Sequence, residues 1–346
     1  MNGILRGSQR AGSGDVPVIG LKGFNGGGSS VMDSAAIASG LAFLNGELEK
    51  RDPKLLEPLT STTWPRDIAV DMGGGWVEHV TNYDVNYSDA GGGENGLGRG
   101  QTTEIPAIQV DTSKNWWDVF TFLRKLHVPL VDQALLQTAG RSLDEMMNKG
   151  LHLTYDKTVD ENVYLGFERL GTYGLVNNPN VLISSVPTGA KGSTMWSTKT
   201  PDEILDDVNL AINETWTRSE FDLQGMANHI LIPPESYKLL VGRRIGEGGQ
   251  VSILTFLLEN NVGQNQGINV AIFPSRWCIG AGIGGTGRMV AYANNRDTVE
   301  FDMTVPLTRT ITQASAEHHA YISAYAAQFS EVKFKRLQPV AYYDGV

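Results

Sequence analysis

Two arms that alternate apolar and polar residues flank a run of glycines in the first third of the chain. The apolar positions of the arms recur at period two, first Tyr83, Val85 and Tyr87, then Ile108 and Val110. Between them, residues 89–100 hold six glycines in twelve positions. This pattern predicts a long two-stranded hairpin, over about residues 76–112, with a glycine-rich tip. Because a hairpin of this kind is only marginally stable alone, something else must pack on it.

The first thirty residues contain nine glycines and almost no apolar periodicity. Such a segment cannot bury enough surface to offset the entropy of ordering, so we expect an arm that is disordered or ordered only against a partner. After it, Asp33 is a suitable N-cap for an amphipathic helix, which ends at Asp52-Pro53 because proline cannot continue a helix.

From Pro129 to about Arg169 the apolar residues recur at steps of three and four. The spacing predicts one nearly unbroken helix of about forty residues, which at 1.5 Å per residue is roughly 60 Å long. No heptad typical of a coiled coil is present. We therefore interpret this helix as a spine.

Beyond Pro179 the pattern is mixed α and β. Thr200-Pro-Asp-Glu predicts a capped helix start, and His229-Ile-Leu-Ile predicts a short buried strand that ends at two prolines. Further strands are expected at residues 268–273 and 289–293, and residues 251–258 fit a helix or a strand. Alternation over residues 321–329 predicts a last long strand.

Composition excludes several classes of protein. The formal net charge is −10, and the acidic balance argues against binding nucleic acid through a clustered basic surface. No apolar run is long enough for a membrane span, and Met1 to Arg6 lack the pattern of a signal peptide. One cysteine, Cys278, permits neither an internal disulfide nor a cysteine metal site.

No motif nominates an active site, a cofactor site or a metal site. Gly280-Ala-Gly-Ile-Gly-Gly285 matches G-x-G-x-x-G, but a strand or turn follows it where a dinucleotide loop needs a helix, so we favour a glycine turn. His318-His319 has poor geometry for one metal. Trp116-Trp117 lacks basic neighbours, which favours packing on a partner or core over base stacking. A paired-carboxylate hydrolase stays open, because spacing in sequence does not give spacing in space.

The order of these elements resembles the major capsid proteins of tailed bacteriophages, whose Hong Kong 97-like α+β fold is shared by encapsulin shells. Four stretches carry the resemblance: Leu44-Asn-Gly-Glu-Leu-Glu-Lys-Arg-Asp-Pro53, Gly171-Thr-Tyr-Gly-Leu-Val-Asn-Asn-Pro179, Ile230-Leu-Ile-Pro-Pro-Glu-Ser-Tyr-Lys-Leu-Leu240 and Pro339-Val-Ala-Tyr-Tyr-Asp-Gly345. Together they span nearly the whole chain from residue 30 onward.

The resemblance implies a division into four parts. Residues 1–63 would be an N-terminal arm, 64–113 an extended loop on a neighbouring subunit, 114–178 with 306–346 a peripheral domain, and 179–305 an axial domain. Contacts between subunits would involve Trp76, Tyr83, Tyr87 and Arg99.

The implied function is structural and needs no cofactor. Hexamers and pentamers would form the icosahedral head of the virion around double-stranded DNA, and the negative charge suits a shell that must not adhere to DNA. Portal, decoration and separate scaffolding proteins would be partners, since the short arm leaves no room for a fused scaffold. Residues 61–113 contain no lysine, so we expect no isopeptide crosslink from this loop. The alternatives are an encapsulin-type shell and a nucleotide-binding enzyme that uses the loop Gly280–Gly285.

Overall fold

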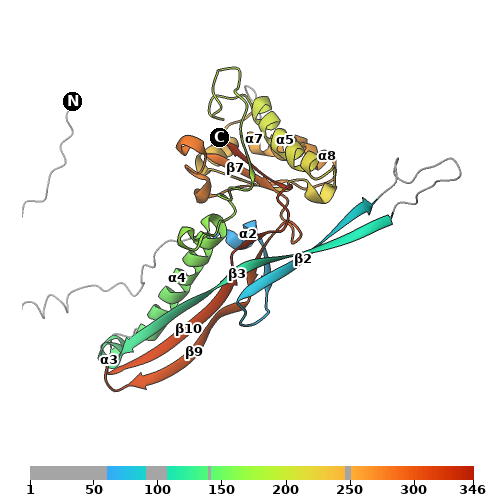
Figure 1. Cartoon of the computed structure of the whole chain (residues 1–346). Coiled ribbons are helices and arrows are strands. Elements are labelled where there is room, and N and C mark those ends of the chain that lie inside the picture. The colour runs from blue at the N-terminus through green and yellow to red at the C-terminus, as the bar shows by residue number, and fades with distance from the viewer. Residues whose placement is uncertain (1–60, 91–106, 139–141, 246–250) are drawn as a thin grey trace, which may run out of the picture. The chain divides into compact units, whose positions relative to one another are not determined.

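The computed structural model describes residues 61–90, 107–138, 142–245 and 251–346, all within one compact unit, Thr60–Val346 (Figure 1). The predicted arm helix over residues 33–52 and the glycine-rich hairpin tip lie outside the described residues.

A single long strand, β3 (Ala107–Pro129), connects the hairpin to a larger sheet (Figure 1). Its first half pairs antiparallel with β2 (His79–Ala90), which confirms the predicted hairpin. Its second half pairs with β10 (Ala320–Ser330), and β9 (Val305–Ser315) lies on the far side of β10. We call the hairpin formed by residues 79–90 and 107–118 the ribbon.

The prediction of one unbroken helix from Pro129 to Arg169 is wrong. Residues up to Pro129 are extended, because Val128 and Pro129 pair with β10. Two helices follow, α3 (Leu130–Thr138) and α4 (Leu143–Leu165). Ser142 caps the second helix by accepting a hydrogen bond from the backbone N–H of Glu145. Its 23 residues make α4 about 35 Å long.

Helix α4 still acts as a spine, because its apolar stripe lies on the sheet. Leu151, Tyr155, Val159 and Val163 are buried at four-residue steps. The ring of Tyr155 packs edge-on against Phe122 of β3 at 5.3 Å between centroids. The helix ends at Gly166, whose positive φ of 69° suits glycine.

A second sheet has five strands in the order β4 (Leu182–Ser185), β12 (Val340–Asp344), β7 (Arg288–Tyr292), β5 (His229–Ile232) and β6 (Ala271–Pro274). Side chains alternate between two buried cores, as in β7, where Met289 and Ala291 enter one core and Val290 and Tyr292 the other. The grouping of residues 340–344 with the peripheral segment is therefore wrong, since β12 pairs with β4 and β7.

Four helices pack in the core on one side of this sheet: α5 (Pro201–Arg218), α6 (Pro234–Gly242), α7 (Ile253–Asn260) and α8 (Val262–Asn265). The predicted start of α5 is confirmed as a full capping box between Thr200 and Glu203. The prolines after β5 begin α6, and residues 253–260 are helical. The remaining short helices are 3₁₀ turns: η2 (Glu168–Leu170), η3 (Leu223–Gly225), η4 (Arg276–Cys278) and η5 (Ile283–Gly285).

A third sheet joins β1 (Ala69–Met72), β8 (Val299–Met303) and β11 (Val332–Phe334), preceded in the chain by the short helix α2 (Trp64–Asp67). Trp64, Asp67 and Ile68 are buried. The start of the extended loop expected over 64–113 is therefore anchored in the core through these three residues, and β1 pairs with β8.

Candidate intersubunit surface

The strand register gives the ribbon two chemically different faces. Residues directly opposite in an antiparallel pair share a face, and successive residues alternate between faces. Tyr83 pairs with Lys114, and Tyr87 pairs with Val110. Asp84, between them, pairs with Ser113 and points to the opposite side.

One face collects six large apolar side chains that are strongly exposed. We call this set the apolar face: Tyr83 (66% exposed), Val85 (47%), Tyr87 (75%), Ile108 (78%), Val110 (59%) and Trp116 (68%). Single exposed apolar residues are ordinary on soluble proteins, but a contiguous patch marks an interaction surface. Lys114 lies over the ring of Tyr83, 5.8 Å from its centroid, yet all six side chains remain strongly exposed.

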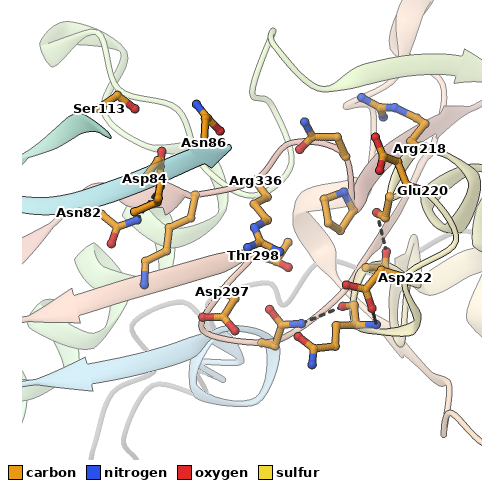
Figure 2. Close-up of a pocket in the computed structure, with 18 of the residues that line it drawn as sticks. Asn82, Asp84, Asn86, Ser113, Arg218, Glu220, Asp222, Asp297, Thr298 and Arg336 are labelled. Carbon is orange, nitrogen blue, oxygen red and sulfur yellow. Dashed lines mark hydrogen bonds between the residues drawn. The ribbon is translucent and has the colours of Figure 1, made fainter. Parts of the chain in front are cut away.

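The other face of the ribbon is polar and is tied together by side-chain hydrogen bonds. Asn82 and Asn115 each donate to the carboxylate of Asp84, at 3.0 and 2.5 Å. Asn82, Asp84, Asn86 and Ser113 line a polar cavity, shown in Figure 2. Its other walls carry charged groups, among them Arg218, Glu220, Asp297 and Arg336. This face is suited to water and polar contacts, in contrast to the apolar face.

The structure exposes three of the four contact residues expected from the sequence. Tyr83 and Tyr87 lie on the apolar face, and Trp76 is 57% exposed in the linker before β2. Arg99 lies outside the described residues. Sequence reasoning did not select Val85, Ile108, Val110 or Trp116 as contacts. Their alternation was visible, but their alignment with Tyr83 and Tyr87 requires the register.

The chain enters the described unit through a buried polar junction. Asp160 of α4 accepts hydrogen bonds from the backbone of Thr63 (3.0 Å), from Arg276 (2.9 Å) and from Trp277 (3.0 Å). Next to it, the carboxylate of Asp67 accepts from Arg66 at 2.5 Å and from Tyr164. Residues 63–67 are therefore fixed to the spine helix.

His229 completes this junction from the five-stranded sheet. Its Nε2 lies 3.1 Å from Oδ1 of Asp67. Burial alone would raise the pKa of Asp67, but the hydrogen bonds from His229, Arg66 and Tyr164 outweigh burial and lower it. The buried carboxylate therefore stays charged and holds its three donors.

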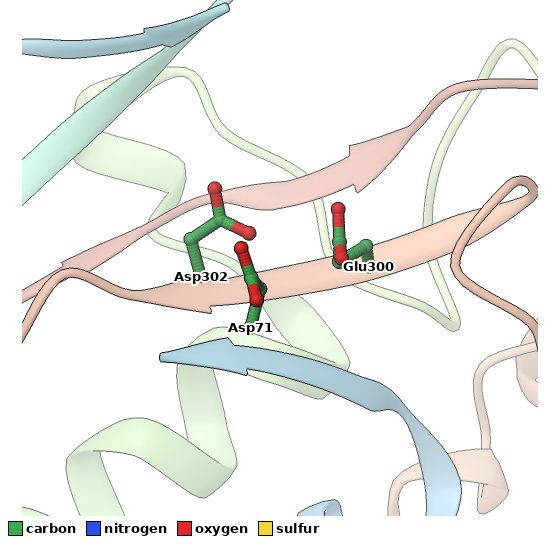
Figure 3. Close-up of side chains that lie close together, drawn as sticks. All are labelled: Asp71, Glu300 and Asp302. Atoms are coloured by element: carbon green, nitrogen blue, oxygen red, sulfur yellow. The ribbon is translucent and has the colours of Figure 1, made fainter. Parts of the chain in front are cut away.

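Three carboxylates gather beside the ribbon's base, on strands β1 and β8 (Figure 3). They are Asp71, Glu300 and Asp302. Three cations lie against them, the first being Arg296, 3.6 Å from Asp71. Lys333 lies 2.9 Å from Glu300 and 2.6 Å from Asp302, and Lys335 lies 2.7 Å from Glu300. Burial opposes ionisation of Glu300, but the bonds from Lys335 and Lys333 prevail and lower its pKa. The group is a charge-balanced structural network, which leaves little net charge to attract a metal ion.

The loop Gly280–Gly285 is a turn between two segments of the five-stranded sheet. It contains η5 and is followed by strand β7, so no helix N-terminus faces it. The carboxylate of Asp344 accepts the backbone N–H of Ile283 at 2.9 Å. This arrangement does not support the dinucleotide-loop hypothesis. In the described part of the chain, no helix is both long and apolar enough to cross a membrane.

Comparison with protein families decides the identity. Residues 93–346, most of the chain, match the family described as major capsid protein. The chain belongs to this family. It is a structural protein of a capsid shell, and its place is the virion, as the resemblance implied.

Solved structures confirm the Hong Kong 97-like fold of this capsid protein. The capsid protein of Myoviridae phage XM1 has 17% identity and a TM-score of 0.72, with 87% of this chain and 98% of that chain covered. The structure from Microbacterium phage Oxtober96 has 13% identity and a TM-score of 0.58, with 89% of this chain and 97% of that chain covered. The capsid of a native GTA particle has 10% identity and a TM-score of 0.58, with 90% of this chain and 99% of that chain covered. A comparison with curated protein sequences returned no match.

Proposed function

We propose that this capsid protein forms hexamers and pentamers that close into an icosahedral head around double-stranded DNA. In this proposal the apolar face of the ribbon is the contact through which one subunit lies on the next. The observation that carries the proposal is the apolar face itself, six large side chains exposed on one side of a hairpin. A hairpin of this length needs a partner, and a neighbouring copy supplies one.

The magnitude is sufficient for assembly. Burying a large apolar side chain contributes about 1.5–3 kcal/mol relative to leaving it exposed. Six partly exposed side chains can therefore contribute on the order of 10 kcal/mol per contact, before the cost of association. Each subunit of a closed shell makes one such contact and receives another, so the contacts add up around the shell and a weak individual contact is enough.

Adjacent residues on opposite faces of the ribbon provide a matched test. Tyr87→Ser removes the most exposed aromatic of the apolar face, and Asn86→Ser introduces the same residue at the adjacent position on the polar face. We expect Tyr87→Ser to leave unassembled subunits with an unchanged melting temperature, and Asn86→Ser to assemble normally. Sedimentation and electron microscopy of particles measure the outcome. Normal shells from Tyr87→Ser, or equal defects in both variants, would contradict the proposal.

The domain layout is also a proposal, in revised form. The extended loop is the ribbon with its glycine-rich tip, and the peripheral domain contains α3, α4, residues 119–129 of β3, β10 and β9. The axial domain contains the five-stranded sheet with its helices, now including residues 340–344. Residues 1–63 form the arm, and Trp76 and Arg99 remain proposed contacts.

We further propose that assembly requires a separate scaffolding protein, and that a portal and a decoration protein complete the head. Expression of the chain alone tests the first point, because closed uniform shells would contradict it. Such shells would favour the encapsulin-type alternative. Particles made together with the partner proteins test that alternative, because DNA protected from nuclease inside them would exclude it. The absence of lysine in residues 61–113 predicts no covalent ladder when particles are boiled in SDS.

We infer that this protein has a structural role and catalyses no reaction. The geometry of the loop Gly280–Gly285 supports this inference. A nucleotide titration followed by tryptophan fluorescence tests it, and saturable binding would reopen the enzyme hypothesis.

A further inference from the structure

The ribbon is connected to the rest of the subunit at two points, which we call its roots. The first root is a glycine linker. Strand β1 ends at Met72, and three successive glycines lead toward β2 with φ angles of +119°, +106° and +74°. Only glycine adopts such angles readily. No described atom outside the adjacent residues lies within 4 Å of where a Cβ would stand on Gly73, Gly74 or Gly75. Side-chain packing therefore does not fix this linker, and its first peptide is held by the N–H of Gly73, which donates to the carbonyl of Met303 at 3.1 Å.

One side chain binds the end of this linker. The carboxamide of Gln328 accepts the N–H of Val77 at 3.1 Å and donates to its carbonyl at 2.7 Å. Gln328 thus satisfies the peptide groups of Val77 as a neighbouring strand would. We call this pair of bonds the Gln328–Val77 contact.

The carboxamide of Gln328 also makes its two remaining hydrogen bonds. Thr304 Oγ1 donates to Oε1 at 3.2 Å, and Nε2 donates to Thr121 Oγ1 at 3.4 Å. An amide can accept two hydrogen bonds and donate two, so all four are made. Gln328 is only 6% exposed and belongs to β10, whose strand pairs fix its backbone. Its orientation is therefore set by the sheet and not by the ribbon.

The second root is continuous. β3 runs from the ribbon into the larger sheet without a glycine, and it changes partners between Asp118 and Val119. The N–H of Val119 donates to Glu78, while the carbonyl of Asp118 accepts from Glu331. These groups point to opposite edges of the strand, so β2 and β10 lie on opposite sides of β3. At this step Glu78 and Glu331 each bond one edge of β3, and beyond them the ribbon and the sheet share only this strand.

We propose that Gln328 is a positioning residue that sets the angle of the ribbon relative to the larger sheet. With the Gln328–Val77 contact made, both roots are fixed. With the contact broken, β3 bends at residues 118–119, and the three glycines absorb the displacement. The contact exists within a single subunit, so it does not depend on the docking of the apolar face. Its consequence for assembly rests on the proposed function.

The chemistry of the side chain makes the proposal specific. Leucine at position 328 keeps the approximate volume and loses all four hydrogen bonds. Glutamate keeps the shape, but when ionised it cannot donate to the carbonyl of Val77. When protonated, its carboxylic acid can again donate to that carbonyl and accept the N–H. Gln328→Glu is therefore expected to hold the ribbon at low pH and to release it at neutral pH.

The experiment measures the unassembled subunit, so its result is separate from that of the assembly test. Amide exchange at Val77 should be about 30-fold faster in Gln328→Leu, as expected for two lost hydrogen bonds of ordinary strength. Gln313→Leu, an exposed change on β9 of the same sheet, should leave this exchange unchanged.

The ribbon angle is read from spin labels on Asn86→Cys and Lys157→Cys, because the native Cys278 is buried. We expect Gln328→Leu to broaden the distance distribution. Gln328→Glu should broaden it at pH 7 and restore the narrow distribution as the glutamate protonates, near or above pH 4.3. His79, Asp118 and Glu331 lie at the ribbon base in every variant, so the wild type at each pH is the control. A distribution in both variants that equals the wild type at all pH values would overturn the proposal.

Discussion

Methionine in place of Arg288 should destabilise the subunit by about 4 kcal/mol. The guanidinium is 7% exposed and joins the start of β7 to the end of β12. It donates to the two carboxylate oxygens of Asp344 at 2.7 and 3.0 Å and to the carbonyl of Val176 at 2.9 Å. Removing one partner of a buried ion pair typically costs 3–5 kcal/mol, because the remaining charge stays buried without compensation.

The same substitution at a surface arginine provides the control. Arg296 is 64% exposed, and its nearest carboxylate, Asp71, lies 3.6 Å away and is itself exposed. A surface pair of this kind contributes less than about 1 kcal/mol. Both variants remove one positive charge and introduce the same side chain, so their difference isolates the effect of burial.

Urea unfolding of the unassembled subunit measures both values. With a slope of about 3 kcal/mol per molar urea, the midpoint of Arg288→Met should fall by about 1.3 M and that of Arg296→Met by less than about 0.3 M. Equal shifts, or a shift below about 0.3 M for Arg288→Met, would refute the reasoning. Such a result would mean that water reaches Asp344 once the guanidinium is gone.

Three further outcomes follow from buried groups. The pKa of Asp67 is lowered in the fold, so its stabilising effect is complete above its usual value near 3.8 and is lost as the pH falls through the lower folded value. Asp67→Asn should therefore lose less stability than the wild type in urea titrations between pH 5 and pH 2. Gly174→Ala should lower the free energy of unfolding by about 3 kcal/mol, because its Cβ would stand 2.2 Å from the backbone of Tyr164. Gly150→Ala, with open space inside α4, should raise the free energy of unfolding by up to about 1 kcal/mol. Thermal melts compare the two variants. Burial raises the pKa of Cys278 to about 12, so a thiol reagent at pH 8 should label it only in urea.

Local signals were sufficient where a single element satisfies its own chemistry. The capping box at Thr200 and the prolines after Ile232 define element boundaries within a few residues, because the bonds involved are local. The alternation around Tyr83 likewise predicted a strand. The six glycines of the hairpin tip did not define the loop length, so the register and the composition of the apolar face required the structure.

Features that depend on distant partners could not be predicted. The apolar spacing continues by coincidence from Leu135 to Leu143, across the start of a new helix at Ser142. The pairing of β12 with β7 joins residues about fifty positions apart, and no local pattern distinguishes the sheets it could enter. Gln328 is one polar residue in an alternating strand, and its bonds to Val77 span 251 positions. Only the fold reveals such contacts.

The continuity of β3 also determines how the subunit transmits force. β3 pairs twelve residues with β2 and eleven with β10, at opposite ends and on opposite edges. Tension between a ribbon anchored on a neighbour and the body of its own subunit runs along the strand axis, nearly perpendicular to the hydrogen bonds. Many bonds then share the load in shear, instead of opening one after another as in peeling. Under the proposed function, outward pressure on the shell therefore loads the strand that joins the two sheets along its length, in tension.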